Sequence, residues 1–246
     1  MIYTLFSPSE GKRSGGENTP VNSDALLFGL PPRKRILDAY NRLVNGDDRE
    51  TVLSLFGLKK PEDALPYIAD VYAAPTLPAV ERYDGVAYDY LDFASLDADA
   101  RAYLQTNLII FSNLFGPLLG GDRIPTYKVK QGNTVGGIAP DRYYKDAFND
   151  KLDALIGDCE ILDLRAGYYD KFYKPFRPVT TMKFIKEGKV VSHWAKAYRG
   201  IVLRHLARHR FASIRELLAS DIPGLHINEI REKRQKTEVV YDIIQA

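Results

Sequence analysis

Two cations three residues apart, Lys196 and Arg199, have the spacing of an anion-binding site at the start of a helix. An apolar run ends at Val190 and Val191, and from Ala195 onward the apolar residues recur at helical spacing. Both cations would then lie near the first turn. Free N–H groups and the positive end of the helix dipole favour a phosphate there. A solvated basic helix face is the alternative interpretation.

The next residue, Gly200, indicates that another group comes close to this helix. Glycine in the middle of a helix costs about 1 kcal/mol relative to alanine. Its presence therefore favours a close approach that a larger side chain would block. Arg204 falls on the same polar half of the expected helix and is a further candidate phosphate ligand.

A polar loop after the first apolar run supplies a second set of candidate ligands. Residues 2–6 have the sequence of a buried strand, and the loop that follows contains Ser9, Glu10 and Lys12. Small residues after a strand let the backbone approach a ligand closely, so we expect Ser9 and Lys12 to bind phosphate. A mobile polar loop is the alternative. The loop matches neither the P-loop nor the dinucleotide-binding pattern.

Two further segments place a lysine near a tyrosine. Tyr127 and Lys128 would face opposite sides of an expected strand, and Tyr169 and Lys171 follow an apolar run that ends at Leu164. We expect both lysines to bind phosphate and Tyr127 or Tyr169 to stack on a displaced or damaged base. The alternatives are packing tyrosines with satisfied hydroxyls and an edge strand protected by lysines.

Candidates for acid–base chemistry are Glu10 and Asp163, which follow or end expected strands. Either could transfer a proton if the loops converge on one site. His205 and His209 have the i, i+4 spacing of a two-histidine ligand pair, but the HExxH glutamate is missing from the sequence. We therefore expect neither a bound metal nor a cofactor.

Composition limits the remaining possibilities. The chain has 246 residues, with 34 cationic and 32 acidic side chains and a net charge of +2. Affinity for nucleic acid must therefore come from local clustering of charge. The single cysteine, Cys159, excludes an internal disulfide framework and suits a reducing cytoplasm. The sequence contains neither an apolar run that could cross a bilayer nor a signal-peptide pattern at its start. We expect a soluble cytoplasmic protein without a membrane partner.

Helix and strand signals alternate without repeats or a dividing linker. We therefore expect one α+β domain over residues 1–246, with a mixed sheet surrounded by helices. The expected strands are 2–6, 108–111, 127–130, 160–164, 180–186 paired with 188–193, and 237–244. The expected helices run from 31 to about 43, 48 to about 56, 61 to about 72, 97 to about 106, 140 to 156 and 213 to about 219, and a further helix starts at 195.

Two of these helical regions carry more specific expectations. Residues 31–75 form a series of short helices that could be a subdomain or a helix-hairpin-helix, which presents backbone N–H groups to phosphates. In the helix over 140–156, Tyr143, Ala147, Leu152 and Leu155 are expected to face the core. The segment 112–117 is expected to be a loop.

Five segments together resemble the YaaA family, the bacterial peroxide stress proteins, over nearly the whole chain. They are SPSEGK at 7–12, YDGVAYDYL at 83–91, FSNLFGPLLGGDRIPTYKV at 111–129, LDLRAGYYDKFYKP at 162–175 and AKAYRG at 195–200. The family often has arginine where this chain has Lys128, which keeps the charge but loses the forked geometry. It often has serine in the segment of Arg165 and Ala166.

The resemblance implies a cytoplasmic α+β protein of unusual topology with a positively charged cleft. It also implies binding of duplex DNA with a helix-hairpin-helix element, and a role in limiting peroxide damage that is linked to intracellular iron. No iron ligand set is visible in the sequence.

Two functional hypotheses follow. The first is a DNA-binding stress protein whose basic cleft holds phosphates largely without sequence preference. The second is an enzyme that acts on a nucleotide or nucleic acid in the same cleft, with Asp163 or Glu10 as general acid or base. A module that binds other proteins has the least support, because no exposed apolar stripe is visible.

Overall fold

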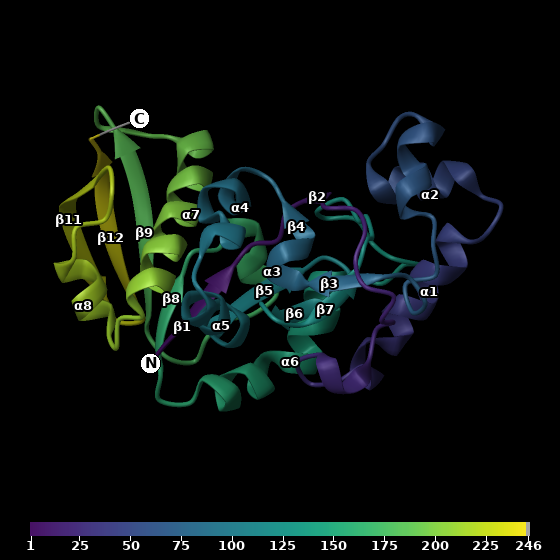
Figure 1. The fold of residues 1–246 in the computed structure, drawn as a ribbon, viewed down its shortest axis with the longest axis horizontal. Coiled ribbons are helices and arrows are strands. Elements are labelled where there is room, and N and C mark those ends of the chain that lie inside the picture. The colour runs from purple at the N-terminus through teal and green to yellow at the C-terminus, as the bar shows by residue number, and fades with distance from the viewer. Residues whose placement is uncertain (245–246) are drawn as a thin grey trace.

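The computed structural model describes residues 1–244, and for Ser192 and His193 it describes only the backbone. A mixed sheet forms the centre of the molecule, in the order β11-β12-β9-β8-β1-β5-β6, with β10 paired to β9 (Figure 1). The pairs from β12 through β9, β8 and β1 to β5 are parallel, and β6, β10 and β11 join antiparallel. The α+β class expected from the sequence is confirmed.

Strands β1, β5 and β8 of the sheet follow apolar runs of the sequence, whereas β11 does not. The bounds of the sheet strands are β1 Ile2–Phe6, β5 Leu108–Ser112, β6 Gly116–Leu119, β8 Glu160–Asp163, β9 Val179–Lys186, β10 Lys189–Val190, β11 Leu225–Lys233 and β12 Lys236–Ile243. Short strands lie outside this sheet, β2 Gly11–Lys12 paired with β4 Tyr83–Asp84 and β3 Thr76–Pro78 paired with β7 Arg123–Pro125. All five residues of β5 are buried, as expected of a strand covered on both faces.

The order of the parallel strands creates a switch point beside β1. Its two neighbours are β5 on one side and β8 on the other, so the chain crosses from one side of β1 to the other between these strands. In open α/β sheets, ligands bind outside the carboxyl ends of strands at such a point. Phe6 and Asp163 are the last residues of β1 and β8, so the loops after them meet at this edge.

Two helices that pack against each other confirm the close approach expected at Gly200. These are α7 (Ser192–His209) and α4 (Val86–Leu91). A Cβ atom built at Gly200 would lie 2.1 Å from the carbonyl oxygen of Ala87, so only glycine fits. The group that approaches the helix here is another helix, not a ligand.

Most of the remaining helices begin and end close to their sequence signals, whereas α3 was not expected. The bounds of these helices are α1 Lys34–Val44, α2 Arg49–Phe56, α3 Ala79–Arg82, α5 Ala98–Asn107, α6 Pro140–Ile156 and α8 Ile214–Ala219. Short 3₁₀ turns cover Ser23–Ala25, Pro31–Arg33, Pro61–Tyr67, Phe93–Ser95 and Gly167–Lys171. Asp48, Asp97 and Ser213 cap α2, α5 and α8 with side-chain oxygens. None of the described helices is both long and apolar enough to cross a membrane.

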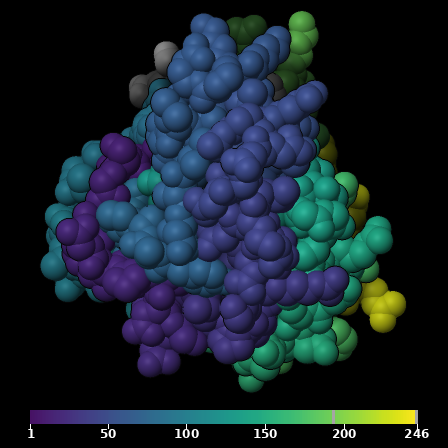
Figure 2. All heavy atoms as spheres, turned by 90° about the vertical axis from the view of Figure 1, so that its right-hand side faces the viewer, coloured from purple at the N-terminus to yellow at the C-terminus, as the bar shows by residue number. Residues whose placement is uncertain are grey.

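The helical segment 31–75 lies at the end of the molecule opposite β11 and β12 (Figure 1). Figure 2 shows that it forms much of the surface on that side. Its third element is a 3₁₀ turn that ends at Tyr67 rather than a helix to Tyr72, because Pro66 lacks the N–H that an α-helix needs. This arrangement lends no support to a helix-hairpin-helix. Buried residues of α1 and α2 belong to the main core, and the single domain remains a prediction.

Other expectations about the fold were wrong. Residues 127–130 form no strand, although their burial alternates, and the strand in this region ends at Pro125. The expected loop 112–117 contains the start of β6, and the sequence interpretation missed β11. In α6, Leu152 is buried as expected, and the most buried side chains at the other three positions are the next residues, Tyr144, Phe148 and Ile156. The expected residues Tyr143, Ala147 and Leu155 are partly buried and pack against the core.

Candidate functional site

A cavity of about 460 Å³ opens at the switch point, and we call it the switch-point cavity. Its walls come from the loop after β1, the start of α4, the loop after β8 and the part of α7 beyond its first turn. The expectation that Lys196 and Arg199 lie near the first turn of their helix was wrong, because α7 begins at Ser192 rather than near Ala195. Five residues singled out from the sequence line it: Ser9, Glu10, Tyr169, Lys196 and Arg199. Segments more than 150 residues apart in the chain therefore supply one site.

Hydrogen bonds hold the loop after β1 in place. The Ser7 hydroxyl accepts from the backbone N–H of Ala166 at 2.8 Å, which ties the loop to the end of β8. The Tyr88 hydroxyl donates to the carbonyl of Ser7 at 2.9 Å, which ties it to α4. Gly85, at φ 140°, lies so near that a Cβ there would be 2.7 Å from the Ser9 hydroxyl. The loop is therefore positioned by groups that also line the cavity.

Arg199 is the cation best placed to bind an anion. Its side chain is partly buried, and burial lowers the pKa of its guanidinium while Asp163 opposes that change. Among the described residues, no hydrogen bond or ion pair of this guanidinium is found. Lys196 lies one turn earlier at the same cavity and is exposed. A buried, unpaired guanidinium gains most from an anionic ligand, since its own charge is otherwise only partly solvated.

Lys12 has a different environment from the one expected of a phosphate ligand. Its ammonium lies 4.2 Å from the centre of the Tyr127 ring and 3.2 Å from the carbonyl oxygen of Ser9. Burial, together with the nearby charge of Lys128, lowers the pKa of Lys12 to about 7, with Glu10 opposing the change. Lys12 is not among the residues that line the cavity. Lys12 instead donates a hydrogen bond to the Ser9 carbonyl in the loop after β1, and is only partly charged near neutral pH.

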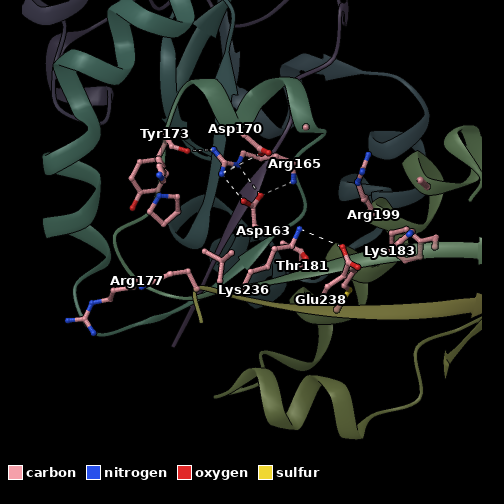
Figure 3. Close-up of a pocket in the computed structure, with 18 of the residues that line it drawn as sticks. Asp163, Arg165, Asp170, Tyr173, Arg177, Thr181, Lys183, Arg199, Lys236 and Glu238 are labelled. Carbon is pink, nitrogen blue, oxygen red and sulfur yellow. Dashed lines mark hydrogen bonds and ion pairs between the residues drawn. The ribbon is translucent and has the colours of Figure 1, made fainter. Parts of the chain in front are cut away.

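The two candidate acid–base carboxylates differ sharply. Asp163 receives two hydrogen bonds from the Arg165 side chain, at 2.9 and 2.7 Å, and does not line the switch-point cavity (Figure 3). Glu10 is exposed at that cavity, where one carboxylate oxygen accepts from the backbone N–H of Gln131 at 3.3 Å. Glu10 is therefore the carboxylate that can meet a ligand, whereas Asp163 is engaged by its neighbour.

Several predicted ligands lie elsewhere. Arg204 donates to the carbonyls of Leu91 and Asp92, both at 2.9 Å, and so caps the end of α4. Lys171 lines no part of the switch-point cavity, and its ammonium lies 5.1 Å from the Tyr168 ring centre. Arg204 is therefore engaged by the protein, whereas Lys171 is exposed and lies away from the switch-point cavity.

The rings proposed for stacking are covered. Tyr127 is 1% exposed, and its hydroxyl bonds those of Tyr83 and Ser112 at 2.8 and 2.7 Å. Tyr169 is 4% exposed and packs edge-on against Tyr168. Neither ring has an open face on which a base could stack in this conformation.

Sequence reasoning gave no role to Arg165, which organises the edge of the site. Beyond Asp163, it donates to the carbonyls of Tyr169 and Tyr173 at 3.1 and 2.9 Å, which holds the segment after β8. Its side chain is only 2% exposed. The usable signal was an arginine two residues after an aspartate, directly at the end of a buried strand.

The described residues contain no cluster of three or more histidine, cysteine or acidic side chains that could hold a metal ion. The rings of His205 and His209 lie 4.5 Å apart, and His205 shares a hydrogen bond with the Ser220 hydroxyl at 2.9 Å. This pair packs with Phe211 at the end of α7.

Comparisons with known proteins agree on one family. The family described as peroxide stress protein YaaA matches residues 2–231. The Campylobacter jejuni protein Cj0984 is 41% identical over 242 residues, which cover 98% of each chain. A UPF0246 protein of Streptomyces coelicolor is 34% identical over 83% of this chain and 82% of its own length. A UPF0246 protein of Corynebacterium efficiens is 33% identical over 96% of this chain and 98% of its own length. By these matches, the chain belongs to the peroxide stress protein YaaA family.

Proposed function

We propose that this chain binds duplex DNA in the cytoplasm during peroxide stress, through backbone phosphates held at the switch-point cavity. The observation that carries the proposal is the partly buried guanidinium of Arg199 beside Lys196, at the switch-point cavity. The free cysteine, Cys159, fits a reducing compartment.

A phosphate would be held from two sides. Arg199 presents a planar fork that can bind two phosphate oxygens at once, and Lys196 adds a mobile point charge near the rim. Because α7 begins at Ser192, both cations lie beyond its first turn, and no described residue of that turn lines the cavity. The contacts of the two cations read charge rather than sequence, so we expect binding to be largely independent of sequence.

The test is fluorescence anisotropy of a labelled duplex over a series of salt concentrations. We expect affinity to fall steeply with salt, and the Lys196→Ala/Arg199→Ala variant to lower the log–log slope by about one unit per lost phosphate contact. The matched control is Lys59→Ala/Lys60→Ala, which removes two exposed cations from the helical segment. Absence of binding at low salt would refute the proposal. A larger effect of the control pair would place the DNA on the helical segment instead.

An enzyme acting on a nucleotide remains the second candidate. Glu10 favours it, because an exposed carboxylate at a cavity of nucleotide size can serve as general acid or base. Lys12, with its pKa near 7, lies beside the same loop. Turnover of a nucleotide by the wild type that is lost in Glu10→Gln, with DNA affinity retained, would favour the enzyme.

A further inference from the structure

One edge of β9 has a gap in its strand pairing. On this edge β8 pairs only with Thr180 and Thr181, and β10 pairs only with Ile185 and Lys186. The other edge is paired with β12 from Val179 to Ile185. Among the described strands, none lies opposite residues 182–184 on the β8 side. Backbone groups that face such a gap need partners, as strand edges do elsewhere.

A second cavity, of about 580 Å³, lies at this gap, and we call it the notch cavity (Figure 3). The Asp163–Arg165 pair bounds it at the end of β8, and Val190 and Ala195 bound it toward α7. The Thr181 hydroxyl, which belongs to a lining residue, is buried and has no hydrogen-bond partner. An unpaired buried hydroxyl is costly, so it indicates a missing partner at this place.

The lining of the notch cavity is rich in positive charge. It contains seven cationic and three acidic side chains. Three of the cations are already paired, Arg165 with Asp163, Arg177 with Asp158 and Lys236 with Glu238. The lining cations outside these pairs are Lys145, Lys174, Lys183 and Arg199. The remaining acid of the lining, Asp170, is exposed and lies 3.8 Å from the Arg165 guanidinium, so none of the described lining acids forms an ion pair with these four cations. The ligand that fits is therefore an anion.

The short length of the gap limits which uncharged group can bind beside the anion. Residues 182–184 are closed in by β8 at one end and β10 at the other, so a peptide strand cannot extend along this edge. A compact planar group with donors and acceptors on its rim can still bind there, as nucleobase edges do with polar protein groups. The volume lies within the range of small-molecule sites.

We propose that the notch cavity binds a nucleoside phosphate, with the base at the free edge of β9 near Thr181 and the phosphate toward Arg199. Arg199 lines both cavities, whereas Lys196 lines only the switch-point cavity and Lys174 only the notch cavity. A nucleotide phosphate bound to Arg199 in the notch cavity therefore competes with a DNA phosphate bound to Arg199 in the switch-point cavity. The bound nucleotide lowers the affinity for DNA, and this last step rests on the proposed function.

Isothermal titration calorimetry at low salt tests the site without DNA. The probes are the four deoxynucleoside 5′-monophosphates, each alone, with deoxyribose 5-phosphate and inorganic phosphate as controls. We expect saturable binding of at least one nucleotide with a Kd below about 1 mM and much weaker binding of both controls. Thr181→Val should weaken it about fivefold, as the loss of one hydrogen bond does. Arg199→Gln should weaken it about tenfold or more.

Two lysine variants distinguish the cavities. Lys174→Ala should weaken nucleotide binding, and Lys196→Ala should leave it unchanged while weakening DNA binding in the anisotropy assay. The inference is overturned if inorganic phosphate binds as tightly as every nucleotide, or if Lys196→Ala and not Lys174→Ala removes nucleotide binding. DNA binding without nucleotide binding would overturn this inference alone, and nucleotide binding without DNA binding would overturn only the proposed function. Circular dichroism checks that each variant is folded.

Discussion

Replacing Gly200 by alanine sets two physical effects against each other. Alanine in a helix is favoured over glycine by about 1 kcal/mol, so propensity alone predicts that Gly200→Ala stabilises the protein. The added methyl group would lie 2.1 Å from the Ala87 carbonyl oxygen and 3.0 Å from the Leu91 nitrogen. Both are backbone atoms of α4, which cannot rotate away as a side chain can.

The clash is the larger effect. Relieving it requires α4 and α7 to separate by about 1 Å, which loosens an apolar contact that is otherwise close-packed. Overpacking of this kind costs about 1–3 kcal/mol or more, and the gain in propensity offsets only part of it. We expect Gly200→Ala to lower the free energy of unfolding by about 1–2 kcal/mol. For a chain of this length, each kcal/mol lowers Tm by about 2–4 °C.

The same displacement reaches the switch-point cavity. Tyr88 on α4 donates to the carbonyl of Ser7, and Gly85 at the start of α4 lies against Ser9. Moving α4 therefore moves the loop after β1. We expect Gly200→Ala to weaken DNA binding as well, under conditions where the variant is still folded.

Urea unfolding followed by circular dichroism measures the change. The control is Gly167→Ala, where a Cβ meets no atom within 4 Å, so its stability should change by no more than about 0.5 kcal/mol. A gain in stability of about 1 kcal/mol for Gly200→Ala would refute the reasoning, because it would mean that helix propensity outweighs the contact.

Three further predictions concern charged side chains. The pKa of Lys12 is lowered to about 7 in the folded protein, so folding releases a proton between pH 7 and 10.5 and stability rises with pH in that window. The stability of Lys12→Met relative to wild type should therefore be highest at pH 6. In urea unfolding, this difference in the free energy of unfolding should fall by up to about 1 kcal/mol per pH unit toward pH 9. A difference that does not change with pH would contradict the lowered pKa of Lys12. Arg165→Met leaves Asp163 unpaired at 10% side-chain exposure and should lower the free energy of unfolding by about 3–5 kcal/mol in the same assay. Adding Asp163→Asn should restore part of this loss. A loss below about 1 kcal/mol would show that the pair does not hold the segment after β8. Arg204→Ala should lower stability by about 1–2 kcal/mol without changing the salt dependence of DNA binding, whereas a slope shallower by one unit would make Arg204 a phosphate ligand.

Helix termini were readable from the sequence because their signals are local. Asp48, Asp97 and Ser213 each accept a hydrogen bond from a backbone N–H of the helix they precede. Gly57 takes the left-handed conformation, φ 67°, that ends α2. Glu187 and Gly188, both at positive φ, form the expected turn between β9 and β10. Each of these needs only its own neighbours in the chain.

Elements defined by distant partners were harder to predict. β11 alternates little between buried and exposed residues, because most of its side chains are exposed at the edge of the sheet. Its existence depends on the ladder with β12. The buried face of α6 is likewise decided by what packs on it, since Phe148 stacks with Phe28 from a segment more than 100 residues away.

The candidate site shows the same division. The sequence by itself determined that Ser9 and Glu10 follow a strand and that Lys196 and Arg199 share a helix, because apolar periodicity marks both elements. Only the tertiary structure decided which charges remain for a ligand. Arg199 and Arg204 share one helix, yet carbonyl groups of α4 and the residue after it satisfy Arg204 and leave Arg199 open. Whether a charge is free depends on burial and hydrogen-bond partners, and distant segments of the chain supply both.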